Sequence, residues 1–228
     1  MLGKTANGLF WMYRYLERAE NTARLIETGQ RIALTRLAGT DEEWRSVLQT
    51  AAVDAAFDAA HDSVTKETAI DWMLRAKDNP SSVRNSISHA RSNARMVRTA
   101  LTHEVWEAVN GGYMEIDALL ARKVSERDLP KVLGLIRSRT ALVRGATDGT
   151  MLRNEIFDFA RIGTFLERAD NTARILDVKY YVLLPRSHRS RQRSRQRAVG
   201  DHPAVQSPAR GGFHMATAPP TIHDIARF

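Results

Sequence analysis

The sequence predicts an all-α fold, an antiparallel bundle of about seven helices. Apolar residues recur with the helical period from near the N-terminus to about residue 182, and period-two alternation is almost absent. Short segments rich in Gly, Pro, Asn or Asp separate the periodic stretches, so successive helices are expected to reverse direction. With 228 residues, 43% of them hydrophobic, the chain can bury one sizeable core or two small ones.

Breaks in this pattern set the expected helix boundaries. Thr40-Asp41-Glu42-Glu43 has the form of a capping box and predicts a helix start. Asn79-Pro80 predicts another start, since proline is tolerated in a first turn, and Gly111-Gly112 is expected to end that helix. Asp148-Gly149-Thr150 is expected to introduce the last helix, which Pro185 follows. The expected helices are about 7–37, 40–60, 68–76, 81–109, 114–124, 130–143 and 151–182.

The composition changes after Pro185, which predicts a helical domain over 1–185 and a tail over 186–228. The tail holds eight Arg and two Asp, a charge of +6, and it has no apolar period. Residues 1–185 carry only +2 of the total +8. We expect the tail to be a disordered basic segment or the product of a shifted reading frame. Nucleic-acid binding is therefore expected only through the tail, at Arg186–Arg197.

Several classes of site and location are excluded by what the sequence lacks. There is no cysteine, so disulfides, thiolate nucleophiles and Cys-ligated metals are excluded. His103-Glu104 lacks the second histidine that a zinc-binding helix needs, and no phosphate-binding glycine loop is present. We expect neither a metal nor a cofactor. No secretory signal and no apolar run near ~20 residues occurs, which predicts a cytoplasmic protein without a membrane span.

A duplicated nonapeptide is the feature most indicative of function. LERAENTAR at Leu16–Arg24 and LERADNTAR at Leu166–Arg174 share eight of nine positions at an offset of 150. The ninth position, Glu20 against Asp170, keeps the charge. Chance does not produce this agreement. At 100° steps the first helix has an apolar side and a polar side, and the motif's charged residues fall on the polar side.

Three interpretations of the polar residues are in competition. Glu20 with Arg24 and Asp170 with Arg174 are acid-then-base pairs at i,i+4, which is typical of a solvated helix face. The other recurring residues are suited to binding a carboxylate or phosphate through an arginine fork, or to forming a buried polar network between the two helices. The candidate binding residues are Glu17, Arg18, Asn21, Arg24, Glu167, Arg168, Asn171 and Arg174.

The opening segment Asn7–Arg24, the break at Asn79–Arg84, and the segment from Gly149–Arg153 through Leu166–Arg174 resemble the bacterial alpha-E domain family. That family is helical and is named for a Glu-Arg motif, which Glu17-Arg18 and Glu167-Arg168 match. The resemblance spans about 1–185.

The resemblance implies a partner and a pathway. Alpha-E domains are expected to work beside a circularly permuted ATP-grasp ligase and transglutaminase-like or amidohydrolase-like proteins, in the synthesis or attachment of peptides. Members usually continue past the position of Pro185 with further helices. Because the basic tail stands there instead, we expect unpaired apolar surface on the last helix.

Three functions follow as hypotheses. The first is an accessory or scaffold domain that binds a ligase or its peptide substrate through the paired Glu-Arg helices, without catalytic activity of its own. The second is an acyl- or peptide-modifying enzyme with Glu17 or Glu167 as the acid–base group, which requires both Glu-Arg pairs to meet in one pocket. The third is binding of nucleic acid or an anionic surface through the Arg-rich tail.

Overall fold

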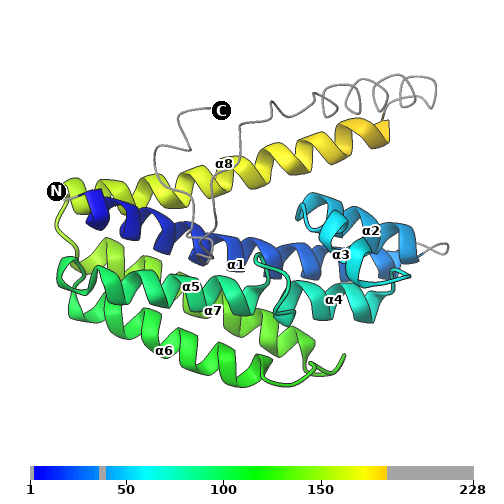
Figure 1. Cartoon of the computed structure of the whole chain (residues 1–228), viewed down its shortest axis with the longest axis horizontal. Helices are drawn as coiled ribbons and strands as arrows, with labels where there is room; N and C mark the ends of the chain where they lie inside the picture. The colour runs from blue at the N-terminus through cyan, green and yellow to red at the C-terminus, as the bar shows by residue number, and fades with distance from the viewer. Residues whose placement is uncertain (1–2, 36–39, 184–228) are drawn as a thin grey trace, which may run out of the picture. The chain divides into compact units, whose positions relative to one another are not determined.

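The computed structural model describes residues 3–35 and 40–183, and every regular element within these ranges is helical, which confirms the all-α class (Figure 1). The chain divides into two compact units, Met1–Val178 and Lys179–Phe228, and the tail expected at 186–228 lies outside the described residues. Eight α-helices and one short 3-10 helix occur in the described ranges. They are α1 (Gly3–Thr35), α2 (Thr40–Thr50), α3 (Asp54–Ala60), α4 (Lys66–Arg75), α5 (Val83–Met96), η1 (Arg98–Ala100), α6 (His103–Leu120), α7 (Leu129–Thr150) and α8 (Glu155–Leu183).

Polar caps and prolines start several helices near the expected positions. The Ser82 hydroxyl accepts a hydrogen bond from the backbone amide of Asn85 and begins α5, just after the Asn79-Pro80 break. Asp128 precedes α7, whose second residue is Pro130. Thr65 forms a capping box at the start of α4. Local side-chain chemistry therefore sets these starts.

Several of the expected boundaries are wrong. The helix expected over 40–60 is two helices, α2 and α3, separated at residues 51–53. The helix expected over 81–109 ends at Met96, and Thr102 caps a new helix, α6, which runs through Gly111 and Gly112 without a break. A Cβ on Gly112 would lie 3.3 Å from the Cβ of Arg139 on α7, so this glycine serves a close helix contact instead of a helix end. Likewise, the segment 148–150 closes α7 instead of opening α8.

The long helices of the first unit reverse direction in turn, and this makes the two motif helices parallel. The hydroxyl of Tyr13 lies 2.6 Å from that of Thr147, and Thr140 donates a hydrogen bond to Glu20, so α1 and α7 are antiparallel. At the join between α7 and α8 the chain turns again. Consequently α8 runs in the same direction as α1, and in Figure 1 both helices begin at the same end.

Helix α1 lies within the core of this unit. Leu9, Met12, Ala19, Ala23 and Ile26 have no exposed surface, because α5 and α7 pack against them. Burial of this apolar stripe is the main contribution that α1 makes to stability. None of the described helices combines the length and the apolar character that crossing a membrane requires.

Candidate functional site

The two copies of the nonapeptide lie side by side and in register. Gly163 of α8 packs on the backbone of α1, where a Cβ would clash with the carbonyl oxygen of Phe10 and lie 3.2 Å from its Cα. Phe10 and Gly163 are 153 residues apart, which is close to the offset of 150 that relates the two copies. Because the helices are parallel, each motif residue faces the neighbourhood of its own counterpart.

Reciprocal ion pairs join the two copies. The Nε of Arg168 donates to Glu17 at 2.7 Å, and the Nε of Arg18 donates to Glu167 at 2.6 Å. Arg14 adds a second guanidinium to Glu167 at 2.7 Å. Both carboxylates are buried, with exposed fractions of 5% for Glu17 and 4% for Glu167. These four motif residues form a polar network between the helices, as one of the three interpretations predicted.

The network keeps its arginines charged. Burial lowers the pKa of Arg18, but its hydrogen bond to Glu167 and the charge of that carboxylate outweigh burial, and the pKa is raised overall. The hydrogen bond to Glu17 likewise raises the pKa of Arg168. Each motif glutamate therefore faces a guanidinium that does not release its proton at any ordinary pH.

Glu20 corrects the expectation of a solvated face in the first copy. Its ion pair with Arg24 forms at 2.8 Å, but Glu20 is buried against α7, where Thr140 donates to it at 2.8 Å and Arg144 also pairs with it. Desolvation raises the pKa of Glu20, yet the hydrogen bonds from Arg144, Arg24 and Thr140 outweigh it and lower the pKa to about 2. The helical wheel missed this because α7 covers that side.

Asp170 keeps the expected environment. Its pair with Arg174 is 2.9 Å long, and both side chains are more than one-third exposed. The predicted i,i+4 pair therefore forms in both copies, but only in the second copy does its acidic member keep substantial exposure to solvent.

Three further residues bind the buried glutamates from outside the duplicated nonapeptide, namely Arg14, Thr140 and Arg144. Arg14 aligns with Thr164 in the second copy, so the repeat does not indicate Arg14 as a functional residue. Thr140 and Arg144 lie on α7, far from either copy in sequence. Their contacts depend on how α7 crosses α1, for which the sequence holds no local signal.

A hollow of about 270 Å³ lies beside the network, between the two motif helices and the ends of shorter elements. Arg18, Glu167, Asn21, Asn171 and Arg174 line it, so five of the eight candidate binding residues meet there. The other three do not line it. They are Glu17, Arg168 and Arg24.

We call this hollow the motif pocket. The rest of its lining comes from two turns and from apolar side chains. Ala51 and Ala52 follow α2, and Ala52 has a φ of 52°, a conformation that costs an L-residue ~1 kcal/mol or more. Asn79 and Ser81 come from the break before α5. The backbone amide of Ser81 donates to the Asn79 side chain, which fixes that turn at the rim. The remaining lining residues are Thr22, Leu25, Thr50, Met73 and Asp170.

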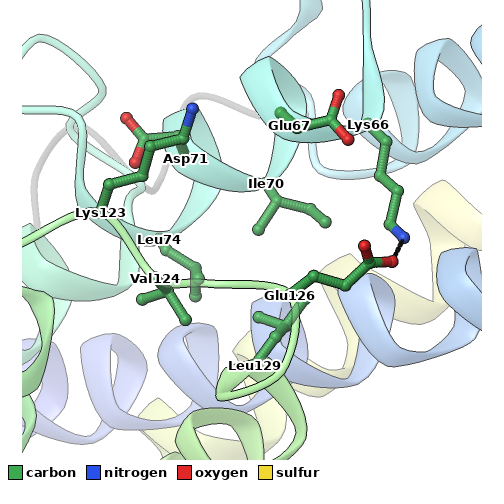
Figure 2. Close-up of a pocket in the computed structure, with 9 residues that line it drawn as sticks. All are labelled: Lys66, Glu67, Ile70, Asp71, Leu74, Lys123, Val124, Glu126 and Leu129. Atoms are coloured by element: carbon green, nitrogen blue, oxygen red, sulfur yellow. Dashed lines mark hydrogen bonds and ion pairs between the residues drawn. The ribbon is translucent and has the colours of Figure 1, made fainter.

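A smaller hollow of about 50 Å³ lies between α4 and the segment before α7, and Figure 2 draws its lining. Ile70, Leu74 and Val124 point into it, and an ion pair between Lys66 and Glu126 closes one side. It holds no motif residue and has room for only a few waters. We assign no function to it.

The described ranges give no support for metal chemistry, since no three His, Asp or Glu side chains gather there in a geometry suited to a metal. The Arg186–Arg197 segment lies outside the described residues, so the nucleic-acid hypothesis stays a prediction.

Comparison with known proteins identifies the family. Residues 1–204 match the Alpha-E family, described as a predicted alpha-helical domain with a conserved ER motif. The match covers most of the chain and extends past Pro185, where the resemblance was expected to end, so the chain belongs to the Alpha-E family. No curated protein and no solved structure matches the chain.

Proposed function

We propose that this member of the Alpha-E family is a cytoplasmic accessory domain that works with an ATP-grasp-type ligase in a peptide-forming pathway. A transglutaminase-like protein is the second expected partner. The observation that carries the proposal is the reciprocal pairing of Glu17 with Arg168 and of Glu167 with Arg18. These pairs hold two helices of the chain together, so the duplicated motif glutamates serve the fold and are not free for chemistry.

The same pairing argues against the two glutamates as an acid–base pair. A general base must have a lone pair within reach of a substrate proton. Glu17 is buried, accepts both of its hydrogen bonds from Arg168 and does not line the motif pocket. Glu167 lines the pocket, but Arg14 and Arg18 hold both of its oxygens.

A stripe on the outside of α8 supports a partner-binding role. Ile162, Leu166 and Leu176 are 41–62% exposed, and Ala169 and Ala173 between them are also exposed. We call these five residues the outer stripe. This spacing places them along one side of the helix. Apolar exposure of this kind, which the sequence predicted for the last helix, marks interaction surfaces.

The repeat indicates what covers the outer stripe. Its equivalents on α1, at an offset of 150, are all buried and covered by other helices of the bundle. Charged groups flank the stripe, since Arg161 and Arg168 lie 4.6 and 5.7 Å from the ring centre of Phe165. We therefore assign the stripe to a helix of the ligase that has an apolar side with acidic flanks.

Affinity purification of the full chain from its native cell tests the proposal. We expect the wild-type chain to recover an ATP-dependent ligase, identified by mass spectrometry, and the purified chain alone to turn over no acyl or peptide substrate. Leu166→Asp should lose the ligase because it places a charge in the stripe. Leu119→Asp changes an equally exposed leucine on α6 and should keep the ligase. Recovery of no ligase by the wild-type chain would contradict the proposal.

An enzymatic role is the alternative, and one observation favours it: Glu167 lines the motif pocket beside Arg18. It predicts turnover of an activated acyl or peptide substrate by the isolated chain. Glu167→Gln should abolish that turnover while circular dichroism stays unchanged. Equal turnover by the two proteins would remove Glu167 as the acid–base group.

A further inference from the structure

We infer that the motif pocket binds the carboxylate end of a peptide-like ligand, an acylated amino acid whose carboxylate and preceding amide are both recognised. The inference rests on the proposed accessory function and names the ligand class of its site. The pocket combines charged, amide and apolar groups in a volume of about 270 Å³. That volume is slightly below the ~300–1,000 Å³ of sites for drug-sized molecules, so the ligand is small.

The arginines of the pocket leave donors available for an anion. Arg18 uses its Nε and one Nη for Glu167, while Arg174 uses a single Nη for Asp170. The other guanidinium nitrogens make no hydrogen bond to the described residues. A guanidinium presents its donors in a planar fork, which fits the two oxygens of a carboxylate.

The charge balance selects a singly charged ligand. Arg18 and Arg174 contribute two positive charges to the lining, and Glu167 and Asp170 contribute two negative ones. A phosphate dianion would approach both carboxylates, and the one further positive charge beside them, Arg14, is already engaged with Glu167 and Asp170. A carboxylate carries half that charge and can lie against the outer edge of Arg174, which is more than one-third exposed.

Asn21 and Asn171 can form hydrogen bonds with the amide group of the ligand. Asn21 comes from α1 and Asn171 from α8, at equivalent positions of the repeat. The Asn21 Nδ2 is buried and has no hydrogen-bond partner among the described residues, and a donor left in that condition costs free energy. A ligand carbonyl would accept from it. Asn171, which makes no hydrogen bond within the described ranges, offers a further donor and acceptor for the same peptide unit.

The apolar part of the pocket lining can accept a small side chain of the ligand. Leu25, Met73, Ala51 and Ala52 contribute apolar groups to the lining. Ala52 is held in the left-handed region, and backbone strain of this kind gathers at ligand sites. The pocket thus offers a carboxylate contact, an amide contact and an apolar contact at once.

Calorimetric titration of the full chain tests the inference with four probes: N-acetyl-alanyl-alanine, its C-terminal amide, free alanine and inorganic phosphate. We expect the acid to bind and the amide to bind at least ~10-fold more weakly, because a charge-assisted contact is lost. Free alanine lacks the acyl group and should also bind more weakly. Binding of phosphate more tightly than of the acid, or equal binding of acid and amide, would overturn the inference.

Variants locate the binding. Arg174→Ala should weaken binding of the acid by ~10-fold or more, and Arg174→Lys should restore only part of it. Arg139→Ala removes a similarly exposed arginine that pairs with Glu115 outside the pocket, and it should bind as wild type. The side-chain amide NMR signals of Asn21 and Asn171 should shift on titration. Wild-type affinity in Arg174→Ala would place the ligand elsewhere and refute the assignment.

Ligase recovery separates the two proposals. If the ligase is recovered and the acid does not bind, the pocket assignment fails and the accessory function stands. If the acid binds through Arg174 and no ligase is recovered, the accessory function fails and the pocket assignment stands.

Discussion

The two copies of the nonapeptide share eight of nine residues, yet they lie in different environments. In α1 the alanines Ala19 and Ala23 are fully buried, whereas Ala169 and Ala173 of α8 are exposed. The second residue of the motif is the exception, because its glutamate is buried in both copies. The helix–helix joint thus constrains the Glu-Arg pair in both copies, while other positions are constrained by neighbours that only α1 has.

This difference has a geometric cause. Helix α1 packs against α5 and α7 in addition to α8, so nearly its whole circumference is covered. Helix α8 uses one side for α1 and leaves the outer stripe exposed. The same sequence is therefore core in one place and surface in the other.

Truncation of the motif glutamates should have the largest effect, and the two copies should differ. Glu167→Ala leaves Arg14 and Arg18, which are only 15% and 23% exposed, without the carboxylate they share, and we expect the free energy of unfolding to fall by about 3–5 kcal/mol. Glu17→Ala leaves Arg168, which is 44% exposed and can be solvated, and should cost about 1.5 kcal/mol. Urea denaturation measures both. Equal losses would mean that the copies are energetically equivalent.

The pH dependence of stability should report the burial of Glu20 among its three hydrogen-bond donors, an environment that only the first copy has. The folded-state pKa of Glu20 is lowered from 4.5 to about 2, so its stabilisation is complete above pH ~4.5 and is lost as the pH falls toward 2. The loss is on the order of 3 kcal/mol. In Glu20→Gln this part of the acid dependence should disappear from urea unfolding measured at pH 2–6. Retention of the full acid-dependent loss in Glu20→Gln would contradict the assignment of that loss to Glu20.

The close contact at Gly163 should make that position intolerant of a side chain. Gly163→Ala puts a methyl group against the backbone of Phe10, and we expect a loss of about 1–3 kcal/mol because the helices must move apart. Gly134→Ala on α7 is the matched control, since nothing lies near its Cβ. It should gain about 0.5–1 kcal/mol through helix propensity. Thermal unfolding followed by circular dichroism should show a lower melting temperature for Gly163→Ala and a higher one for Gly134→Ala.

The i,i+4 pairs should show the smallest effect. Arg174→Ala removes an exposed pair with Asp170 and should cost about 0.2–0.5 kcal/mol. Arg24→Ala removes two hydrogen bonds to the buried Glu20, which keeps Thr140 and Arg144, and should cost up to about 1 kcal/mol. Chemical denaturation at low and high salt compares them. A larger loss at Arg174 than at Arg24 would contradict the difference in burial.

Helix starts and the duplicated motif could be predicted from the sequence, but the composition of the site could not. Caps and prolines act on their own helix, so Ser82 and Pro130 mark starts wherever the helix packs. The helix end predicted at Gly111-Gly112 is wrong, because a glycine that permits close packing and one that ends a helix look the same in sequence. Arg14 and Arg144 were missed because their partners lie 153 and 124 residues away.

By itself the sequence determined that the chain is helical, that two helices carry the same Glu-Arg motif, and that this motif belongs to the Alpha-E family. Only the tertiary structure decided that the two motif helices are parallel, that each glutamate pairs with the arginine of the other copy, and that Glu20 is buried. The reason is physical. A helical period and a cap depend on neighbours within a few residues, whereas burial and ion pairing depend on which helix covers each side, and that follows from the packing of the whole bundle.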